Sequence, residues 1–186
     1  MNIPFDVTKY TIETDRLTLR AFTMDDLQDF FEYASVPGVG ESAGWPHHRS
    51  IEVTRGVLAA FLERKESFAI FYKEHKKVIG SISLRPSWSN EHEVYKHLTA
   101  KEVGYVVSKT YWNKGIATEA LRGIIQFAFD ELKLQALGLA HFAGNEKSKH
   151  IAEKCGFVYV ETDSFYSRAL QKNFDDIRYI LPGGTQ

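Results

Sequence analysis

The chain contains 186 residues, with 23 Lys and Arg against 24 Asp and Glu, seven His and a single Cys. At this length we expect one domain over residues 1–186, because chains usually divide into two domains only beyond about 250 residues. The balanced charge argues against a nucleic-acid-binding protein, and no run approaches the ~20 apolar residues of a membrane-spanning helix. A lone Cys155 cannot form an internal disulfide, and the first ten residues lack the apolar run of a signal peptide, so a cytoplasmic protein is expected.

Hydrophobic periodicity predicts a strand, two helices and a hairpin in the first half of the chain. Residues 16–22 alternate apolar and polar side chains, as in a half-buried strand. Thr23 and Ser50 are residue types that favour the position just before a helix. The predicted elements are a strand over 16–22, a helix to about Ser35, a loop over 37–46, a helix to about Lys65, and hairpin strands over 68–72 and 78–84.

The second half predicts two units in which a strand and a loop lead into a helix. The helix over 117–132 has the clearest signal, because its apolar residues recur at spacings of three and four. A strand, helix and strand joined over this length form a parallel, right-handed crossover, so the fold class is predicted as mixed α/β or α+β. The predicted elements are a charged, mobile link over 86–101, a strand over 103–107, a loop over 108–115, the helix over 117–132, a strand over 136–142, a loop and helix over 144–155, and strands near 157–161 and 177–181.

The loop before the central helix is suited to bind a phosphate. Residues 102–120 are EVGYVVSKTYWNKGIATEA, so Lys114 and Gly115 stand just before the helix begins. The first N–H groups of a helix lack partners within the helix and lie at the positive end of its dipole, where phosphates bind if small residues leave space. Gly115, Ala117 and Ala120 leave that space, although an ordinary turn explains one glycine equally well. The loop matches neither the Walker A nor the G-x-G-x-x-G pattern.

A second segment, NEKSKHIAEKCGF over residues 145–157, follows this loop and helix, and the two segments together are typical of one protein family. Together the two segments resemble the acetyl-CoA-dependent N-acetyltransferases of the GNAT superfamily, and specifically its RimJ/RimL branch. That branch has W-G-K-G-Y-A-T-E-A and then N-x-x-S followed by K-x-G-F. TDRLTLR at 14–20 and FDDIRY at 174–179 resemble its first and last strands, so the resemblance extends over roughly residues 12–181. It implies a mixed, mostly antiparallel GNAT sheet with a central parallel strand–helix–strand unit and helices on both faces.

The resemblance implies that acetyl-CoA binds as a co-substrate. The loop and helix start would donate backbone N–H groups to the pyrophosphate, the preceding strand would pair with the pantetheine, and Asn145 would contact the pantetheine from the other side. The chain departs from the superfamily consensus at Trp112, where Gln or Arg is usual, and at Asn113, where Gly is commoner. The implied cofactor-binding residues are Tyr105, Val106, Val107, Trp112, Asn113, Lys114, Gly115, Ile116, Ala117, Thr118 and Asn145.

Acetyl transfer to an amine needs a neutral amine, a stabiliser for the charge on the carbonyl oxygen, and a proton for the departing thiolate. At pH 7 roughly one peptide α-amino group in ten is neutral, against about one lysine side chain in 2,500, so a base assists catalysis. Glu102 at the start of the strand is the candidate catalytic base, acting through water, with a solvated carboxylate as the alternative. A backbone N–H near Val106 would stabilise the carbonyl oxygen. The Tyr that many family members use as the acid corresponds to Ala152, so the resemblance assigns Ser148 as proton donor, unless Ser148 only caps its helix.

The acceptor is the part that the sequence specifies least. Residues 38–48 combine flexible glycines with one Trp and two His, and loops at this place form the acceptor wall in the branch. We therefore expect substrate contacts from Glu41, Trp45, His47 and His48, with a His as an alternative base and core packing as the alternative for Trp45.

The acceptor would be a small-molecule amine or a protein N-terminus, which attacks acetyl-CoA directly. A non-catalytic acyl-CoA-binding or sensing domain is the alternative function. No metal is expected, because His92 and His97 are one residue too far apart for the H-E-x-x-H pattern. Neither a nucleic acid nor a membrane is an expected partner, and a homodimer is compatible with such folds although no pattern in the sequence specifies one.

Overall fold

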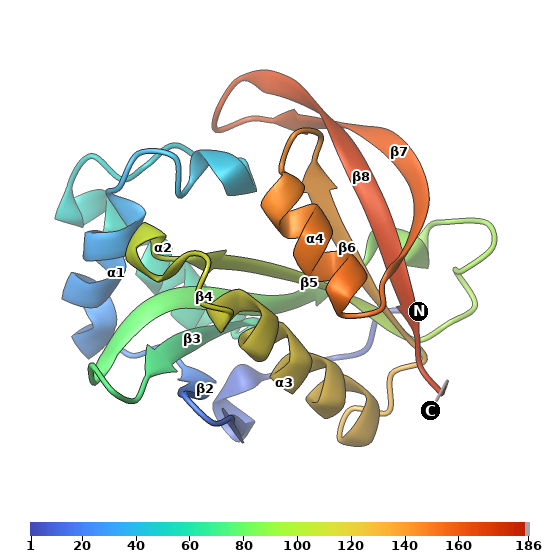
Figure 1. Ribbon diagram of the computed structural model, residues 1–186, viewed down its shortest axis with the longest axis horizontal. Coiled ribbons are helices and arrows are strands. Elements are labelled where there is room, and N and C mark those ends of the chain that lie inside the picture. Colours follow the sequence, from blue (N-terminus) through green and yellow to red (C-terminus); the bar gives the residue numbers. More distant parts are fainter. Residues whose placement is uncertain (185–186) are drawn as a thin grey trace.

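One eight-stranded sheet runs through the molecule (Figure 1). The computed structural model describes residues 1–184, and its strands follow the order β1-β2-β3-β4-β5-β6-β8-β7. Every neighbouring pair is antiparallel except β5 and β6, which are parallel. The predicted mixed, mostly antiparallel sheet is therefore confirmed. The strands are β1 (Thr11–Glu13), β2 (Leu17–Ala21), β3 (Ser67–Tyr72), β4 (Lys77–Pro86), β5 (Ala100–Val107), β6 (Ala136–Phe142), β7 (Val158–Ser167) and β8 (Lys172–Pro182).

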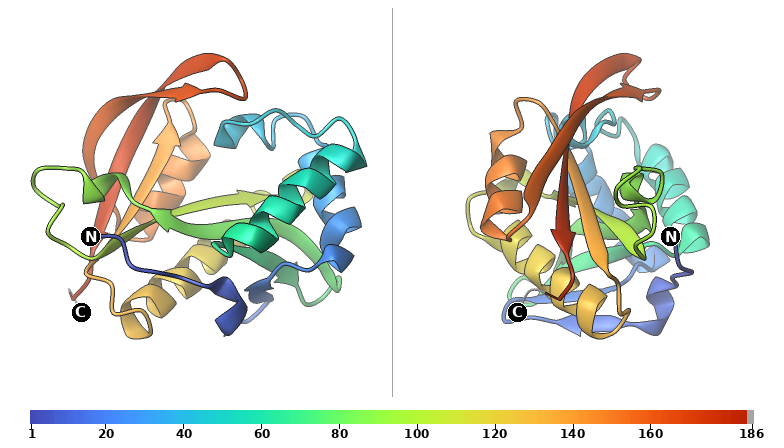
Figure 2. Two further views of the ribbon diagram at one scale, coloured as in Figure 1. Left: turned by 180° about the vertical axis from the view of Figure 1, so that it is seen from behind. Right: turned by 90° about the vertical axis from the view of Figure 1, so that its right-hand side faces the viewer.

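Helices cover both faces of the sheet. In Figures 1 and 2, α1 and α2 lie on one face and α3 and α4 on the other, and each pair encloses its own hydrophobic cluster. No helix within residues 1–184 combines the length and the apolar character needed to cross a membrane. The α-helices are α1 (Leu27–Ala34), α2 (Ile51–Arg64), α3 (Ile116–Asp130) and α4 (Glu146–Lys154), and the short 3-10 turns are η1 (Val7–Lys9), η2 (Met24–Asp26), η3 (Glu41–Ala43), η4 (Trp88–Asn90) and η5 (Lys109–Tyr111).

The helices α2 and α3 form close to their predicted positions because their local signals are strong. The Ser50 side chain accepts a hydrogen bond from Val53 N at 3.4 Å, as expected of the residue that caps α2. Leu121, Ile124 and Phe127 of α3 face the sheet and are buried. Burying each such side chain contributes roughly 1.5–3 kcal/mol, so the apolar stripe fixes which face of α3 meets the sheet.

Two segments outside the predicted strands, the link over 86–101 and the residues between the last two strands, are packed parts of the fold. Between β4 and β5, Trp88, Tyr95 and Leu98 pack against a small buried cluster of Ala100, Ala136 and Ile180. Residues 162–174 form the outer end of the β7–β8 hairpin, where Phe165 pairs in register with Phe174. Packing on a buried cluster orders the first segment and cross-strand pairing orders the second, and hydrophobic periodicity along the chain records neither kind of contact.

The β5–β6 ladder ends part-way along both strands, and this opening positions the candidate site. Val103 and Leu139 are the last paired residues, so β5 continues from Gly104 to Val107 with β4 on one side only. The unpaired edge of β5 lies beside the start of α3 and beside α4. A strand that has lost one neighbour offers N–H and C=O groups that an extended ligand can pair with.

Candidate active site

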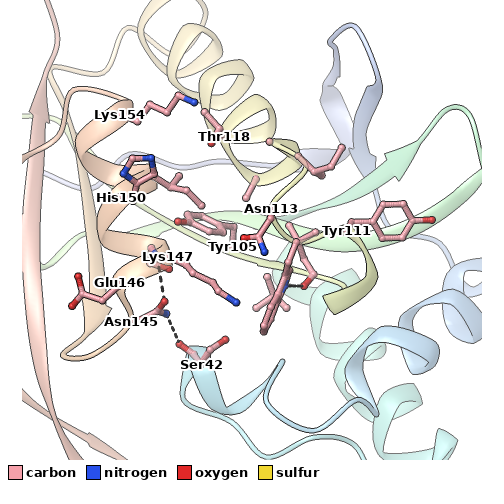
Figure 3. A pocket seen from close by; sticks show the side chains of 18 of the residues that line it. Ser42, Tyr105, Tyr111, Asn113, Thr118, Asn145, Glu146, Lys147, His150 and Lys154 are labelled. Atoms are coloured by element: carbon pink, nitrogen blue, oxygen red, sulfur yellow. Dashed lines mark hydrogen bonds between the residues drawn. The ribbon is translucent and has the colours of Figure 1, made fainter.

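A cleft of about 540 Å³ lies between the free end of β5, the start of α3 and the helix α4 (Figure 3). It brings together most of the residues that the sequence assigns to the cofactor, and Lys114 is not among those that line it. The lining residues are Val39, Ser42, Tyr105, Val106, Val107, Tyr111, Trp112, Asn113, Gly115, Ile116, Ala117, Thr118, Asn145, Glu146, Lys147, Ser148, His150, Ile151 and Lys154.

The first turn of α3 faces this cleft. Asn113 and Gly115 have positive φ angles of 61° and 76°, which turn the chain from η5 into the helix. Gly adopts this conformation without a steric penalty, and Asn adopts it more readily than most other residues. The N–H groups that begin α3 lack partners within the helix and lie at the positive end of its dipole. This end of the cleft is therefore suited to bind a phosphate.

A hydrogen-bonded clamp holds the loop before α3 against the β1–β2 turn. The Glu119 carboxylate accepts hydrogen bonds from Thr14 Oγ1 at 2.6 Å, from Arg16 N at 2.8 Å and from Arg16 Nε at 2.6 Å. Arg16 Nη1 in turn donates to the backbone oxygen of Lys114 at 3.0 Å. Burial acts to raise the pKa of Glu119, but the bonds from Thr14 and Arg16 lower it overall, so the carboxylate stays ionised.

The positive side chains at the cleft come from α4. Lys147 Nζ lies 3.9 Å from the centre of the Trp112 ring, and the Trp112 indole N–H donates to Val107 O at 2.8 Å. Lys154 lines the cleft further along α4. Lys114 instead lies over the Tyr111 ring at 5.5 Å and is not among the residues that line the cleft.

The unpaired edge of β5 carries the backbone groups of Tyr105 and Val107. Ser108 N donates to Ile79 O at 2.7 Å, so Ser108 faces β4. Successive residues of a strand face opposite neighbours, which means that Val106 also faces β4 while Tyr105 and Val107 face the opening. The N–H expected near Val106 as a stabiliser of the carbonyl oxygen is therefore engaged with β4, and those of Tyr105 and Val107 are the ones directed to the cleft.

Asn145, Ser148 and Tyr105 meet at the inner end of the cleft. Asn145 Oδ1 accepts from Ser148 N at 3.2 Å, so Asn145 caps α4 and the Ser148 hydroxyl is not the cap. In Figure 3 the Tyr105 side chain points from β5 toward α4. Its hydroxyl is buried without a hydrogen-bond partner among the described residues. Burial raises the pKa of Tyr105 to about 12, with the neighbouring Ser148 side chain opposing the rise, so the phenol keeps its proton.

Glu102 lies on the other side of the opening. Its carboxylate is 3.3 Å from Arg85 Nη2 and accepts a long hydrogen bond of 3.4 Å from Trp88 N. Burial raises the pKa of Glu102 above its usual range, and Arg85 and the Trp88 N–H only partly oppose this. A carboxylate with a raised pKa is a stronger base than a solvated one. The alternative of a solvated carboxylate at the strand start does not describe this burial.

A second cavity of about 140 Å³ adjoins the cleft and opens beside Glu102. The two cavities share Ser42, Tyr105, Asn145 and Ser148. The smaller cavity, called the acceptor cavity below, is lined by Ser42, Ala43, Glu102, Val103, Gly104, Tyr105, Leu139, Ala140, His141, Phe142, Asn145, Ser148, Phe165 and Asp176.

The four loop residues expected to contact substrate line neither cavity. Glu41 accepts hydrogen bonds from Gly38 N at 2.7 Å and from His47 N at 3.1 Å, and its carboxylate lies 2.8 Å from His47 Nδ1. The Trp45 ring packs on Gly40 and on His48, whose Nδ1 is 2.8 Å from Thr54 Oγ1 in the core. These side chains fold the loop onto itself and onto the α1–α2 core, so Val39, Ser42 and Ala43 reach the cavities in their place.

The structure adds residues that the sequence does not single out. His141, Phe142, Phe165 and Asp176 come from three strands and meet in the acceptor cavity. Asp176 lies within the FDDIRY motif, which is the one signal that points toward it. Among residues 1–184 no cluster of His, Cys, Asp and Glu is arranged to hold a metal ion.

Comparisons with known proteins agree with this architecture. A family model described as an acetyltransferase (GNAT) domain matches residues 16–158. An uncharacterized N-acetyltransferase of Bacillus subtilis, YoaA, is 29% identical over 151 residues, which cover 78% of this chain and 81% of that protein. An acetyltransferase of the GNAT family from Bacillus anthracis superposes with a TM-score of 0.79 at 22% identity, covering 93% of this chain and 98% of its own. The microcin C7 self-immunity acetyltransferase MccE, solved with acetyl-CoA and AMP, superposes with a TM-score of 0.73 at 18% identity, covering 91% of this chain and 93% of its own.

Proposed function

The chain belongs to the GNAT acetyltransferase family, and on that premise we propose that its two cavities bring acetyl-CoA and a primary amine together for direct transfer of the acetyl group. The observation that carries the proposal is the meeting of the cleft and the acceptor cavity at Tyr105 and Ser148, at the point where β5 and β6 separate. The W-N-K-G-I-A-T-E-A and N-x-x-S motifs favour the RimJ/RimL branch, as one domain over residues 1–186. The single Cys155 favours a cytoplasmic enzyme.

The cleft fits acetyl-CoA. The start of α3 offers free N–H groups to a pyrophosphate, and Lys147 and Lys154 add positive charge along α4. The unpaired edge at Tyr105 and Val107 suits the amide groups of a pantetheine arm. The buried Tyr105 hydroxyl lacks a partner among the described residues, as expected of a group that meets a ligand. When bound, acetyl-CoA supplies a thioester whose acetyl carbon is open to attack and whose sulfur departs.

Glu102 prepares the amine for attack. A protonated amine has no free electron pair, so Glu102 first accepts a proton from it, directly or through water. The neutral nitrogen then forms a bond to the acetyl carbon while the carbon–sulfur bond breaks. The raised pKa of Glu102 brings its basicity closer to that of the amine, which favours the transfer.

Tyr105 and Ser148 serve the leaving group. The backbone N–H groups of Tyr105 or Val107 stabilise negative charge on the carbonyl oxygen. The Tyr105 phenol keeps its proton at neutral pH and, with Ser148 beside it, can pass a proton to the departing thiolate. The nitrogen loses a second proton as the amide forms, and this proton replaces the one that Tyr105 passed to the thiolate. The products are an N-acetylamine and CoA thiol, and the proton held by Glu102 is released to solvent.

The test combines acetyl-CoA with a panel of amines. Release of CoA thiol, matched by the mass of an acetylated product, is the expected result. Binding of acetyl-CoA with no product from any amine would instead support a non-catalytic acyl-CoA-binding domain. Thermal stabilisation by ATP but not by acetyl-CoA would remove acetyl-CoA as the ligand of the cleft.

A further inference from the structure

The acceptor cavity has an acidic lining. Among the described residues that line it, Glu102 and Asp176 carry carboxylates and no Lys or Arg is present. Arg85 lies 3.3 Å from Glu102 and Arg178 lies 3.5 Å from Asp176.

These two guanidinium groups do not neutralise the negative charge at and around the acceptor cavity. Arg178 also binds Glu161 at 3.0 Å and Asp163 at 2.6 Å, so four carboxylates face two guanidinium groups here. His92, 3.7 Å from Glu161, adds positive charge only when protonated. The cavity therefore favours a cationic group and disfavours an anionic one.

One wall of the acceptor cavity is aromatic. Phe142 stacks between Phe165, with ring centres 5.6 Å apart, and Phe174, with ring centres 4.2 Å apart. Phe142 and Phe165 line the cavity, and Phe165 is 43% exposed. An exposed ring beside a cavity can stack a flat apolar group of a ligand.

A hydrogen bond connects the β7–β8 hairpin to the loop after α1 beside the acceptor cavity. Ser167 Oγ donates to Gly44 O at 2.7 Å, and a Cβ on Gly44 would stand 3.0 Å from the Phe142 ring. Asn145 Nδ2 also reaches Ser42 O at 3.4 Å. Figure 1 shows the hairpin leaning toward this loop. The cavity volume of about 140 Å³ suits a small amine better than a protein segment.

Two buried polar atoms of residues that line this cavity lack a hydrogen-bond partner among the described residues. His141 is 8% exposed, and its Nε2 has no hydrogen-bond partner among the described residues, while its Nδ1 lies 3.0 Å from Phe142 O. The Tyr105 hydroxyl is in the same condition. Buried polar atoms are normally satisfied, so His141 Nε2 points to a bound polar group in this cavity. The Tyr105 hydroxyl lies on the wall shared with the cleft and points to a ligand where the two cavities meet.

We propose that the acceptor is a small arylalkylamine, whose ammonium group lies near Glu102 and Asp176 and whose flat ring stacks on the exposed Phe165 and meets the edge of Phe142. This assignment rests on the proposed function and names its substrate class. A carboxylate on the carbon next to the amine would face Glu102 and Asp176, so the corresponding amino acid is a poor substrate. The contact between the hairpin and the loop leaves less room for a protein N-terminus than for a small amine, so a peptide is a poorer substrate.

A panel of four amines tests the proposal: 2-phenylethylamine, L-phenylalanine, propylamine and a short unstructured peptide. The expected kcat/KM for 2-phenylethylamine exceeds that for each of the others by at least about tenfold. A peptide or phenylalanine that matches or exceeds 2-phenylethylamine would overturn the proposal. Absence of thiol release with every amine, while acetyl-CoA still binds, would instead refute the proposed function.

Two substitutions with matched controls locate the contacts. Phe165→Ala should lower kcat/KM for 2-phenylethylamine about three- to tenfold without changing that for propylamine, while Tyr166→Ala, at the exposed neighbouring position, changes neither. Asp176→Asn should narrow the preference for 2-phenylethylamine over phenylalanine, and the exposed Asp175→Asn should leave it unchanged. Acetyl-CoA binding and thermal unfolding verify that each variant is folded. An unchanged preference in both folded site variants would show that these residues do not form the acceptor contacts.

Discussion

Replacing Glu119 with Ala removes the carboxylate that joins the start of α3 to the β1–β2 turn. The side chain is 17% exposed and accepts bonds from Thr14 Oγ1, Arg16 N and Arg16 Nε. All three donors would lose a charged acceptor. The bonds from Thr14 Oγ1 and Arg16 N each contribute about 1.5–3 kcal/mol, and the bond from Arg16 Nε belongs to an ion pair. Arg16 is 42% exposed, so the ion pair itself adds only about 0–1 kcal/mol. Because such contributions are not additive, we expect a loss of roughly 3 kcal/mol in the free energy of unfolding.

Thermal unfolding and acetyl-CoA binding measure the two consequences. A loss of that size lowers the Tm of a chain of this length by roughly 6–12 °C. The freed loop should also weaken acetyl-CoA binding about three- to tenfold, because ordering it again costs free energy. At saturating acetyl-CoA the kcat should remain near that of the parent.

Two further variants separate the clamp from a general effect on α3. Glu119→Gln keeps an oxygen acceptor and should lose only about a third as much stability. Glu131→Ala removes an exposed carboxylate at the other end of α3 and should change neither quantity. A Glu119→Ala protein that unfolds within about 2 °C of the parent and binds acetyl-CoA with the parent Kd would refute the clamp.

Three more substitutions probe the proposed chemistry and the loop after α1. Tyr105→Phe should lower kcat at least about tenfold with little change in KM for acetyl-CoA; an unchanged kcat would leave Ser148 as the proton donor. In the parent, kcat should fall as pH falls through the raised pKa of Glu102, because the protonated carboxyl cannot act as a base. Glu102→Gln should lower kcat about a hundredfold and remove this pH dependence. If the variant still loses kcat at acidic pH, another group is the base. Burial acts to raise the pKa of Glu41, but hydrogen bonds from His47 and Gly38 lower it to about 2. The contribution of Glu41 to folding stability is therefore present above the ordinary pKa of 4.5 and is lost as pH falls toward 2. The Tm of Glu41→Gln should consequently depend less on pH over this range than the Tm of the parent. Equal plots of Tm against pH for the two proteins would contradict this.

The cofactor side of the site is predictable from sequence because its signals are local. The turn at Gly115 and the apolar stripe of α3 each act within a few residues of chain, and the structure forms both. The cap of α4 is Asn145, whereas the sequence offers Ser148 as a possible cap. Even here the sequence does not show which lysine reaches the cleft. Lys114 lies over the Tyr111 ring and does not line the cleft, whereas Lys147 lines it from α4.

The acceptor side is not predictable in the same way because strand register creates it. Phe142 and Asp176 are partners in the β6–β8 ladder, and Glu102 approaches them only because β5 and β6 are parallel neighbours. No local pattern records such a pairing. Glu41 and His47, which the loop sequence suggests as substrate contacts, instead bind each other. A charged or aromatic residue in a loop can thus contact a substrate or hold the loop together, and only the fold shows which of the two it does.

The shared wall of the two cavities also has a kinetic consequence. Both the cleft and the acceptor cavity open to solvent, and they meet only at Ser42, Tyr105, Asn145 and Ser148. Neither reactant then has to pass through the place of the other, so each can arrive first and each product can leave by its own opening. We expect CoA to compete with acetyl-CoA but not with the amine, and the acetylated amine to compete only with the amine. In product-inhibition experiments, competition of CoA with the amine would mean that one reactant covers the entrance of the other.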